Sequence, residues 1–165
     1  MNLTAIEYVK ILELNPHPEG GWYKEMYRSA GKHAGENEFP QGRNYSTAIY
    51  FLIEKDNFSA FHKIKSDETW HFYAGDALEV IELDSAGVIR KTIVGPDIQN
   101  GHLLQYTVPA GNWFGSRVYG EGAFSLVGCT VAPGFDFRDF EMAVREQLVN
   151  QFPDHLDIIR ELTRE

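Results

Sequence analysis

The chain has 165 residues, of which 43% are hydrophobic and 13% aromatic, and its formal net charge is −9. This size and composition are typical of one folded domain with a substantial core. The acidic balance argues against nonspecific binding to nucleic acid, which depends on clusters of Lys and Arg. No apolar run approaches the roughly 20 residues that a membrane-spanning helix needs. We therefore expect a single domain over residues 1–165 that binds neither nucleic acid nor membranes.

The expected compartment follows from the N-terminal segment and from cysteine usage. The start, MNLTAIEYVKILEL, lacks the basic residues and apolar core of a signal peptide. Cys129 is the single cysteine of the sequence, so no internal disulfide can form, and its apolar surroundings favour a small buried hydrophobe. Both observations make the cytoplasm the expected location.

The first element predicted in chain order is a helix over about residues 4–14. Thr4 can cap this helix, with Glu7 as the capping-box partner three residues later. The helix should end before the Asn-Pro pair that follows, because a residue before proline is biased away from helical backbone. The next residues, HPEGG, form a loop in which we interpret His17 as a residue that shapes the backbone.

Short strands separated by turn residues are predicted from about residue 21 to residue 132, a pattern typical of a sandwich or barrel. Residues 30–44 interrupt this pattern with a polar, glycine-rich segment that we expect to be a mobile loop or flap. Arg43, at its end, is interpreted as a solvated surface charge. The aromatic strand over residues 21–27 is the candidate contact of a two-fold homodimer.

The pattern becomes helical after residue 133, and two helices are predicted within residues 137–164. Asp136, Asp139 and Glu141 stand where this helical region begins. Acidic residues at a helix start suit the helix dipole and need no catalytic explanation. The predicted fold class is therefore all-β with flanking helices.

Residues 59–76, SAFHKIKSDETWHFYAGD, carry the most specific motif. By the two-residue alternation of a strand, His62 and Ile64 share one face, and Glu68 opens the next strand. The stretch resembles the first signature of the cupin superfamily, in which His-x-His, three or four residues, Glu, six residues and Gly line the mouth of a small β-barrel. His62, Glu68 and Gly75 keep this register, whereas Ile64 stands at the position of the second histidine.

The second cupin signature, Pro-x-Gly-x-x-His, is matched by PAGNWF at residues 109–114, with Phe114 in place of the histidine. Two ligands of the usual cupin metal site are thus retained, His62 and Glu68, whereas catalytic zinc sites use about three protein ligands. His71 is the candidate third ligand, but alternation places it on the opposite face from Glu68 unless a bulge turns it inward. We expect no metal cofactor, with a divalent ion on these residues as the alternative.

Longer segments resemble one group within the superfamily, the small cupin-like proteins known as domain of unknown function 985. These segments are LNPHPEGGWYKEMYRS (14–29), STAIYFLI (46–53), HKIKSDETWHFYAGD (62–76), QYTVPAGNWFGS (105–116) and GCTVAPGFDFRDFE (128–141). The resemblance implies a cupin-type jelly-roll β-barrel. It also implies a pocket similar to that of metal-free epimerases of dTDP-4-keto-6-deoxyhexoses, in which a histidine base and a tyrosine acid move a proton next to a ketone.

The catalytic candidates are His62, Glu68 and Tyr73. His62 is the expected base, because an imidazole exchanges protons near neutrality, and Glu68 would orient it or carry the proton itself. Tyr50, Tyr73 and Tyr106 are all candidate proton donors, and the sequence does not choose among them.

The ligand-binding candidates share a place on the strands and loops expected around the pocket. They are Arg28, Thr47, Tyr50, Ser59, Trp70, His71, Gln105 and Trp113. Arg28 can pair with a phosphate or carboxylate. The two tryptophans are most simply lining and core residues, with stacking against a sugar or nucleobase as the alternative.

The sequence thus indicates an isomerase or epimerase, without a metal, that acts on a small carbohydrate-like or nucleotide-linked molecule. One alternative is a small-molecule binding protein that keeps the barrel without the chemistry. The other is a metal-dependent oxygenase that uses His62, Glu68 and His71. The sequence does not identify the substrate.

Overall fold

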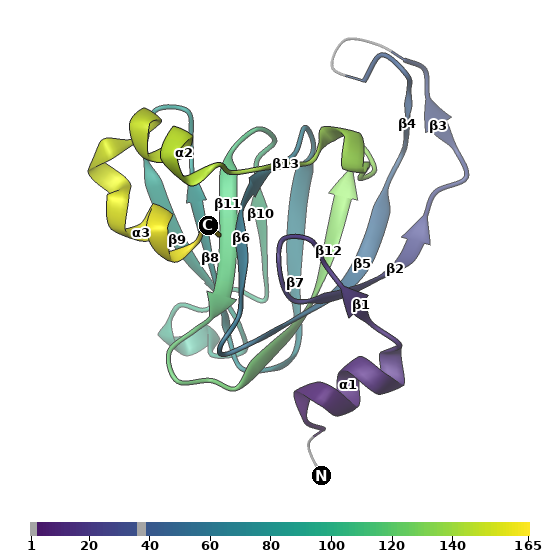
Figure 1. Cartoon of the computed structure of the whole chain (residues 1–165). Coiled ribbons are helices and arrows are strands. Elements are labelled where there is room, and N and C mark those ends of the chain that lie inside the picture. The colour runs from purple at the N-terminus through teal and green to yellow at the C-terminus, as the bar shows by residue number, and fades with distance from the viewer. Residues whose placement is uncertain (1–2, 36–38) are drawn as a thin grey trace.

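The computed structural model describes residues 3–35 and 39–165, and most of its strands form two sheets that face one another (Figure 1). The six-stranded sheet has the order β1 (Asn15–Pro16), β2 (Trp22–Arg28), β5 (Thr47–Glu54), β12 (Phe124–Ala132), β7 (Asp67–Gly75), β10 (Gln105–Val108). The five-stranded sheet has the order β13 (Glu141–Met142), β6 (Phe58–Lys63), β11 (Trp113–Val118), β8 (Leu78–Leu83), β9 (Ile89–Val94). Neighbouring strands in both sheets are antiparallel. The all-β jelly roll with flanking helices that the sequence predicts is confirmed.

The helices lie before and after the strands. They are α1 (Ala5–Leu12), α2 (Arg145–Gln151) and α3 (Leu156–Glu161), with 3₁₀ turns η1 (Ile98–Asn100), η2 (Phe137–Asp139) and η3 (Pro153–His155). At the start of α1, the Glu7 carboxylate accepts hydrogen bonds from the backbone N–H of Thr4 at 2.8 Å and from its hydroxyl at 2.7 Å. Glu13, with a φ of 55°, ends the helix in the left-handed conformation.

Apolar side chains fill the space between the sheets and cover their outer faces. Along β5, Phe51 packs between the sheets, whereas its neighbour Leu52 packs in a separate cluster with α1 and β12. A third cluster joins β6 and β8 to α2 and α3, with Phe61 fully buried at its centre. Burial of each such large side chain contributes about 1.5–3 kcal/mol. Apolar packing therefore stabilises the sheets on their inner and outer faces. The cavity described below lies next to β2 and β5.

The C-terminal region departs from the sequence prediction at its beginning. The helices expected from residue 137 begin instead at Arg145. Asp136 accepts a hydrogen bond from the backbone N–H of Arg138 at 2.9 Å and so caps η2. Glu141 then enters β13, which pairs with β6. The backbone hydrogen bonds of this sheet edge and the burial of neighbouring aromatic side chains outweigh the local helical pattern.

Residues 30–44 also differ from the expected loop. They contribute the two strands β3 (Lys32–His33) and β4 (Arg43–Asn44), which pair with one another, and residues 36–38 lie outside the described residues. The prediction of Arg43 as a solvated charge is wrong, because its side chain is only 6% exposed. It pairs with Asp139 and, at 3.2 Å, with Asp136. A buried arginine requires such partners. Both partners are distant in the chain, so a local sequence pattern does not predict them.

The strand expected at a dimer contact is β2. It lies between the two-residue strand β1 and β5, and it exposes Met26 and Tyr27. Dimer formation through this strand stays a prediction.

Candidate functional site

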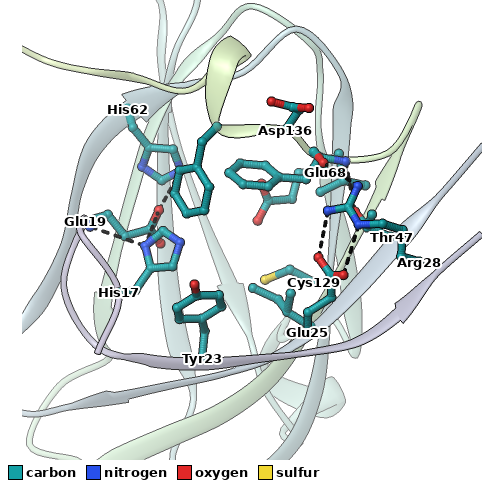
Figure 2. A pocket seen from close by; sticks show the side chains of 14 residues that line it. His17, Glu19, Tyr23, Glu25, Arg28, Thr47, His62, Glu68, Cys129 and Asp136 are labelled. Atoms are coloured by element: carbon teal, nitrogen blue, oxygen red, sulfur yellow. Dashed lines mark hydrogen bonds and ion pairs between the residues drawn. The ribbon is translucent and has the colours of Figure 1, made fainter. Parts of the chain in front are cut away.

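A cavity of about 320 Å³ opens between the two sheets, next to β2 and β5. Strands β2, β5, β6, β7 and β12 contribute side chains to it, as do His17, Glu19 and residues 135–137. Its lining residues are His17, Glu19, Tyr23, Glu25, Arg28, Thr47, Ile49, His62, Glu68, Cys129, Val131, Phe135, Asp136 and Phe137. Figure 2 shows that His17, Glu19 and His62 lie together on one side and Arg28 and Glu25 on the other.

The loop between β1 and β2 carries Glu19 into the cavity. Gly20 has a φ of +116°, and a Cβ at this position would lie 2.1 Å from the carbonyl oxygen of Phe58. The backbone therefore approaches β6 more closely than any residue with a side chain allows. The N–H of Ala60 donates to the carbonyl of Glu19 at 2.9 Å, which ties this loop to β6 beside His62.

Glu19 and His62 form a buried pair. The Nδ1 atom of His62 lies 2.8 Å from the carbonyl oxygen of Ala60, which can only accept, so we assign the Nδ1 proton to this bond. The Nε2 atom then faces Glu19 Oε2 at 3.2 Å. A neutral Nε2 and a carboxylate are both acceptors, so one proton must lie between them. The pair consequently holds a proton that either group can carry.

Burial decides which of the two groups carries that proton. Burial raises the pKa of Glu19 above its ordinary value, with His17 and a hydrogen bond from Ser59 opposing this effect. Burial also lowers the pKa of His62, against the opposing influence of Glu68. Both changes favour the uncharged forms, in which Glu19 carries the proton. The Ser59 hydroxyl donates to its other oxygen, Oε1, at 2.9 Å and holds the carboxyl group in place.

Glu68 is the second buried carboxyl group of the cavity. Burial, the largest influence, raises the pKa of Glu68 from its ordinary value of 4.5 to about 7. His62 and a hydrogen bond from the Cys129 thiol oppose this increase, whereas the nearby carboxyl group of Glu19 adds to it. Burial also keeps the pKa of the Cys129 thiol well above its ordinary value, so the thiol stays protonated and donates. Glu68 can therefore both accept and donate a proton near neutral pH.

Comparison with known proteins shows the family of this chain. The family model described as "Cupin superfamily (DUF985)" matches residues 6–143. The chain belongs to this family. An uncharacterised protein of Saccharomyces cerevisiae is 31% identical over 139 residues, which make up 77% of this cupin and 69% of the yeast protein.

Solved structures extend the similarity over nearly the whole chain. A hypothetical protein from Leishmania major is 42% identical, with a TM-score of 0.92 over 99% of this cupin and 100% of that chain. A protein from Shewanella oneidensis is 38% identical, with a TM-score of 0.88 over 98% of each chain. Oxalate decarboxylase from Bacillus subtilis is 15% identical, with a TM-score of 0.55 over 90% of this cupin and 37% of the enzyme. At that identity the likeness shows the shared fold alone.

Four of the residues predicted from the sequence line the cavity. They are Arg28, Thr47, His62 and Glu68. The Thr47 hydroxyl accepts the backbone N–H of Phe135 at 2.9 Å and so positions the segment that covers the cavity. Ser59 stands behind the lining, where it holds Glu19.

None of the three candidate tyrosines lines the cavity, and Tyr106 lies on β10. A register shift between β12 and β7 leaves Tyr73 without a partner, and its ring packs against Tyr50 at 5.9 Å. Both tyrosines line a shallow groove beside α1. The tyrosine that reaches the cavity is Tyr23, whose hydroxyl points toward the cavity interior in Figure 2.

The other predicted ligand-binding residues also lie outside the lining. Trp70 is fully buried in the core, and Trp113 packs under Lys63, whose Nζ lies 4.4 Å from the ring centre. Gln105 is exposed on β10. His71 points away from Glu68, as strand alternation predicts, and its Nε2 lies 3.1 Å from the Thr130 hydroxyl.

The residues present do not fit the usual cupin metal site. Phe114, at one missing histidine position, packs its ring 4.2 Å from the ring of His62, and Ile64, at the other, is buried in the core. Within residues 3–35 and 39–165, no three His, Cys, Asp or Glu side chains are arranged to hold a metal ion. We therefore derive no chemical step through a metal.

The lining residues that sequence reasoning missed include four polar ones, His17, Glu19, Tyr23 and Glu25. The interpretation of His17 as a residue that only shapes the backbone is corrected, because its ring lines the cavity and its Nδ1 lies 3.4 Å from Glu19 Oε2. The paired glycines of HPEGG were the available signal, since they permit a close approach of backbone.

In the part of the chain that the structure describes, no helix is long and apolar enough to cross a membrane.

Proposed function

We propose that this cupin is an isomerase or epimerase that moves a proton next to a carbonyl group of a small carbohydrate-like molecule. The observation that carries this proposal is the placement of two buried carboxyl groups, Glu19 and Glu68, on one cavity together with His62. Pairs of titratable groups in a dry cavity are typical of acid–base catalysis.

The size of the cavity supports a small substrate. Its volume of about 320 Å³ lies at the lower end of the roughly 300–1,000 Å³ of typical ligand pockets. A monosaccharide fits within such a space. If the sugar is linked to a nucleotide, as in the epimerases that the sequence resembles, the nucleotide extends beyond the cavity mouth.

Glu68 is the proposed base. Its carboxylate accepts the proton from the carbon next to the carbonyl group, and the electron pair of that C–H bond forms an enediolate. Tyr23 donates a hydrogen bond to the developing oxyanion. Return of a proton to the opposite face of the same carbon gives the epimer, and return to the neighbouring carbon gives the isomer.

Glu19 is the proposed acid, and His62 positions it. Both ring nitrogens of His62 have partners within the protein, Ala60 and Glu19. The imidazole therefore acts through the carboxyl group of Glu19 rather than on the substrate, which changes the role that the sequence suggests for it. Glu19 donates its proton to the enediolate and recovers one from solvent, while Glu68 releases to solvent the proton that it took from the substrate.

Deuterium exchange tests the proposal. The protein is incubated in D₂O with a panel of neutral pentoses and hexoses and the corresponding uronic acids, and NMR follows exchange of the hydrogens next to the carbonyl group. We expect exchange in at least one compound, reduced by about 10²–10⁴-fold in Glu68→Gln. Glu54→Gln is the matched control, because Glu54 does not line the cavity. Its carboxylate accepts a hydrogen bond of 3.1 Å from Trp22 Nε1, and the glutamine side chain keeps an acceptor for that bond.

Two outcomes would contradict the enzyme. One is the absence of exchange throughout the panel, and the other is equal exchange by wild type and Glu68→Gln. Saturable binding without exchange would instead support the second candidate function, a noncatalytic binding protein. The engagement of both His62 nitrogens within the protein favours that alternative.

A further inference from the structure

Arg28 differs from every other group around the cavity. It is the one Lys or Arg among the described residues that line the cavity. Two of its guanidinium hydrogen bonds go to protein oxygen atoms that have no role in the chemistry proposed above, those of Asn44 and Phe135. The other edge of the guanidinium group faces the carboxylate of Glu25. Arg28 therefore resembles an anion-binding subsite that is occupied by a carboxylate of the protein itself, that of Glu25.

A bulge in β2 creates this arrangement. The pairing of β2 with β5 shifts between Glu25 and Tyr27, so that Met26 has no partner. Without the bulge, residues 25 and 28 would point to opposite faces of the sheet, since strand side chains alternate. With it, Glu25 and Arg28 both face the cavity.

The orientation of the guanidinium group is fixed from one edge. Its Nη1 donates to Asn44 Oδ1 at 3.2 Å and to the carbonyl oxygen of Phe135 at 3.0 Å. The opposite edge donates to Glu25, from Nε to Oε1 at 3.0 Å and from Nη2 to Oε2 at 2.7 Å. Two parallel N–H···O bonds of this kind are the geometry in which arginine recognises a carboxylate.

Glu25 is a replaceable occupant of that edge. Its side chain is 41% exposed, and Arg28 is the partner that the structure records for its carboxylate among the described residues. Ion pairs at this exposure contribute little to stability, so Glu25 can rotate into solvent. Asp136, the other carboxylate near Arg28, is already bound by Arg43 and Arg138. Release of Glu25 therefore leaves the positive charge of Arg28 to a ligand.

We propose that Arg28 binds the carboxylate of the substrate, which displaces Glu25, and that the substrate is consequently a sugar acid such as a uronic acid. This inference rests on the proposed function of the same cavity. Figure 2 shows Arg28 across the cavity from Glu19 and His62. A small molecule held by its carboxylate on Arg28 extends from there toward the acid–base groups.

Matched pairs of probes test the carboxylate requirement. Binding of D-glucuronate and D-galacturonate is compared with binding of D-glucose and D-galactose by NMR titration of the folded protein. We expect at least one uronate to bind about tenfold or more tightly than its neutral sugar, because a charge-assisted bidentate contact is gained. Glu25→Gln should tighten uronate binding about threefold to tenfold and leave the neutral sugars unchanged.

Arg28→Gln should remove the preference for the uronate. Because Arg28 also holds Asn44 and Phe135, thermal unfolding of this variant is measured in parallel, and Glu25→Gln provides a variant that keeps those contacts. Equal affinity for acid and neutral sugar, unchanged uronate binding in Arg28→Gln, or no uronate binding by either wild type or Glu25→Gln would each overturn the inference.

The binding test separates this inference from the enzyme proposal. A uronate that binds through Arg28 without deuterium exchange would contradict the isomerase and keep the carboxylate subsite. Exchange in a neutral sugar, with no preference for the acid, would keep the isomerase and contradict the subsite.

Discussion

Replacement of Glu68 by glutamine should change how the stability of this cupin depends on pH. Burial raises the pKa of Glu68 from 4.5 to about 7 in the folded chain, while the unfolded chain keeps the ordinary value. Between these two values the unfolded state loses the proton and the folded state retains it. The free energy of unfolding of the wild type therefore falls as pH rises through this window.

The magnitude follows from the two pKa values. The difference between 4.5 and about 7 corresponds to about 3 kcal/mol at 1.36 kcal/mol per pKa unit. Glutamine has no proton to lose and keeps a similar shape. The free energy of unfolding of Glu68→Gln, relative to wild type, should thus rise by about 3 kcal/mol between about pH 4.5 and about pH 8.

Urea unfolding monitored by tryptophan fluorescence measures this difference at several pH values. Glu7→Gln is a control of opposite sign, because hydrogen bonds from Thr4 lower the pKa of Glu7 in the folded chain. The stabilisation by Glu7 is present above its unfolded pKa and is lost as pH falls. Parallel profiles for wild type and Glu68→Gln would refute the reasoning, since they would mean that the Glu68 carboxyl group is solvated rather than buried.

Two further predictions concern the segments that surround the cavity. Gly20→Ala should destabilise the protein and displace Glu19, because its Cβ would lie 2.1 Å from the Phe58 carbonyl oxygen, whereas a Cβ at Gly101, also at positive φ, meets nothing within 4 Å. Equal unfolding midpoints of Gly20→Ala and Gly101→Ala in urea would contradict this. Arg43→Gln should lower the free energy of unfolding by about 3 kcal/mol, because it leaves Asp139 buried without its closest cation. A urea midpoint within error of wild type would show that the pair is solvated.

The features that the sequence predicted well depend on residues close together in the chain. The capping pair of Thr4 and Glu7 is three residues apart, and both hydrogen bonds to the Glu7 carboxylate are present. Strand alternation and turn residues predicted the β architecture. The spacing of the cupin motif predicted His62 and Glu68 near one pocket. In the structure His62 lies on β6 of one sheet and Glu68 on β7 of the other, and both line the cavity.

The features that the sequence did not predict depend on contacts between distant residues. The partners of Arg43, Asp136 and Asp139, are 93 and 96 residues further along the chain. Bulges add a second difficulty, because one extra residue in a strand moves every later side chain of that strand to the opposite face of the sheet. The bulge of β2 brings Glu25 to the side of Arg28.

The sequence by itself determined the strand-rich fold, the first helix and the cupin register, because alternation, capping and turn preference act within a few residues. Only the tertiary structure decided the chemistry of the cavity. Glu19 meets Ser59 and His62 across about forty residues of chain, and burial there, not residue type, shifts the pKa of each group. Desolvation depends on every segment that excludes water from the cavity, so no local pattern could have specified it.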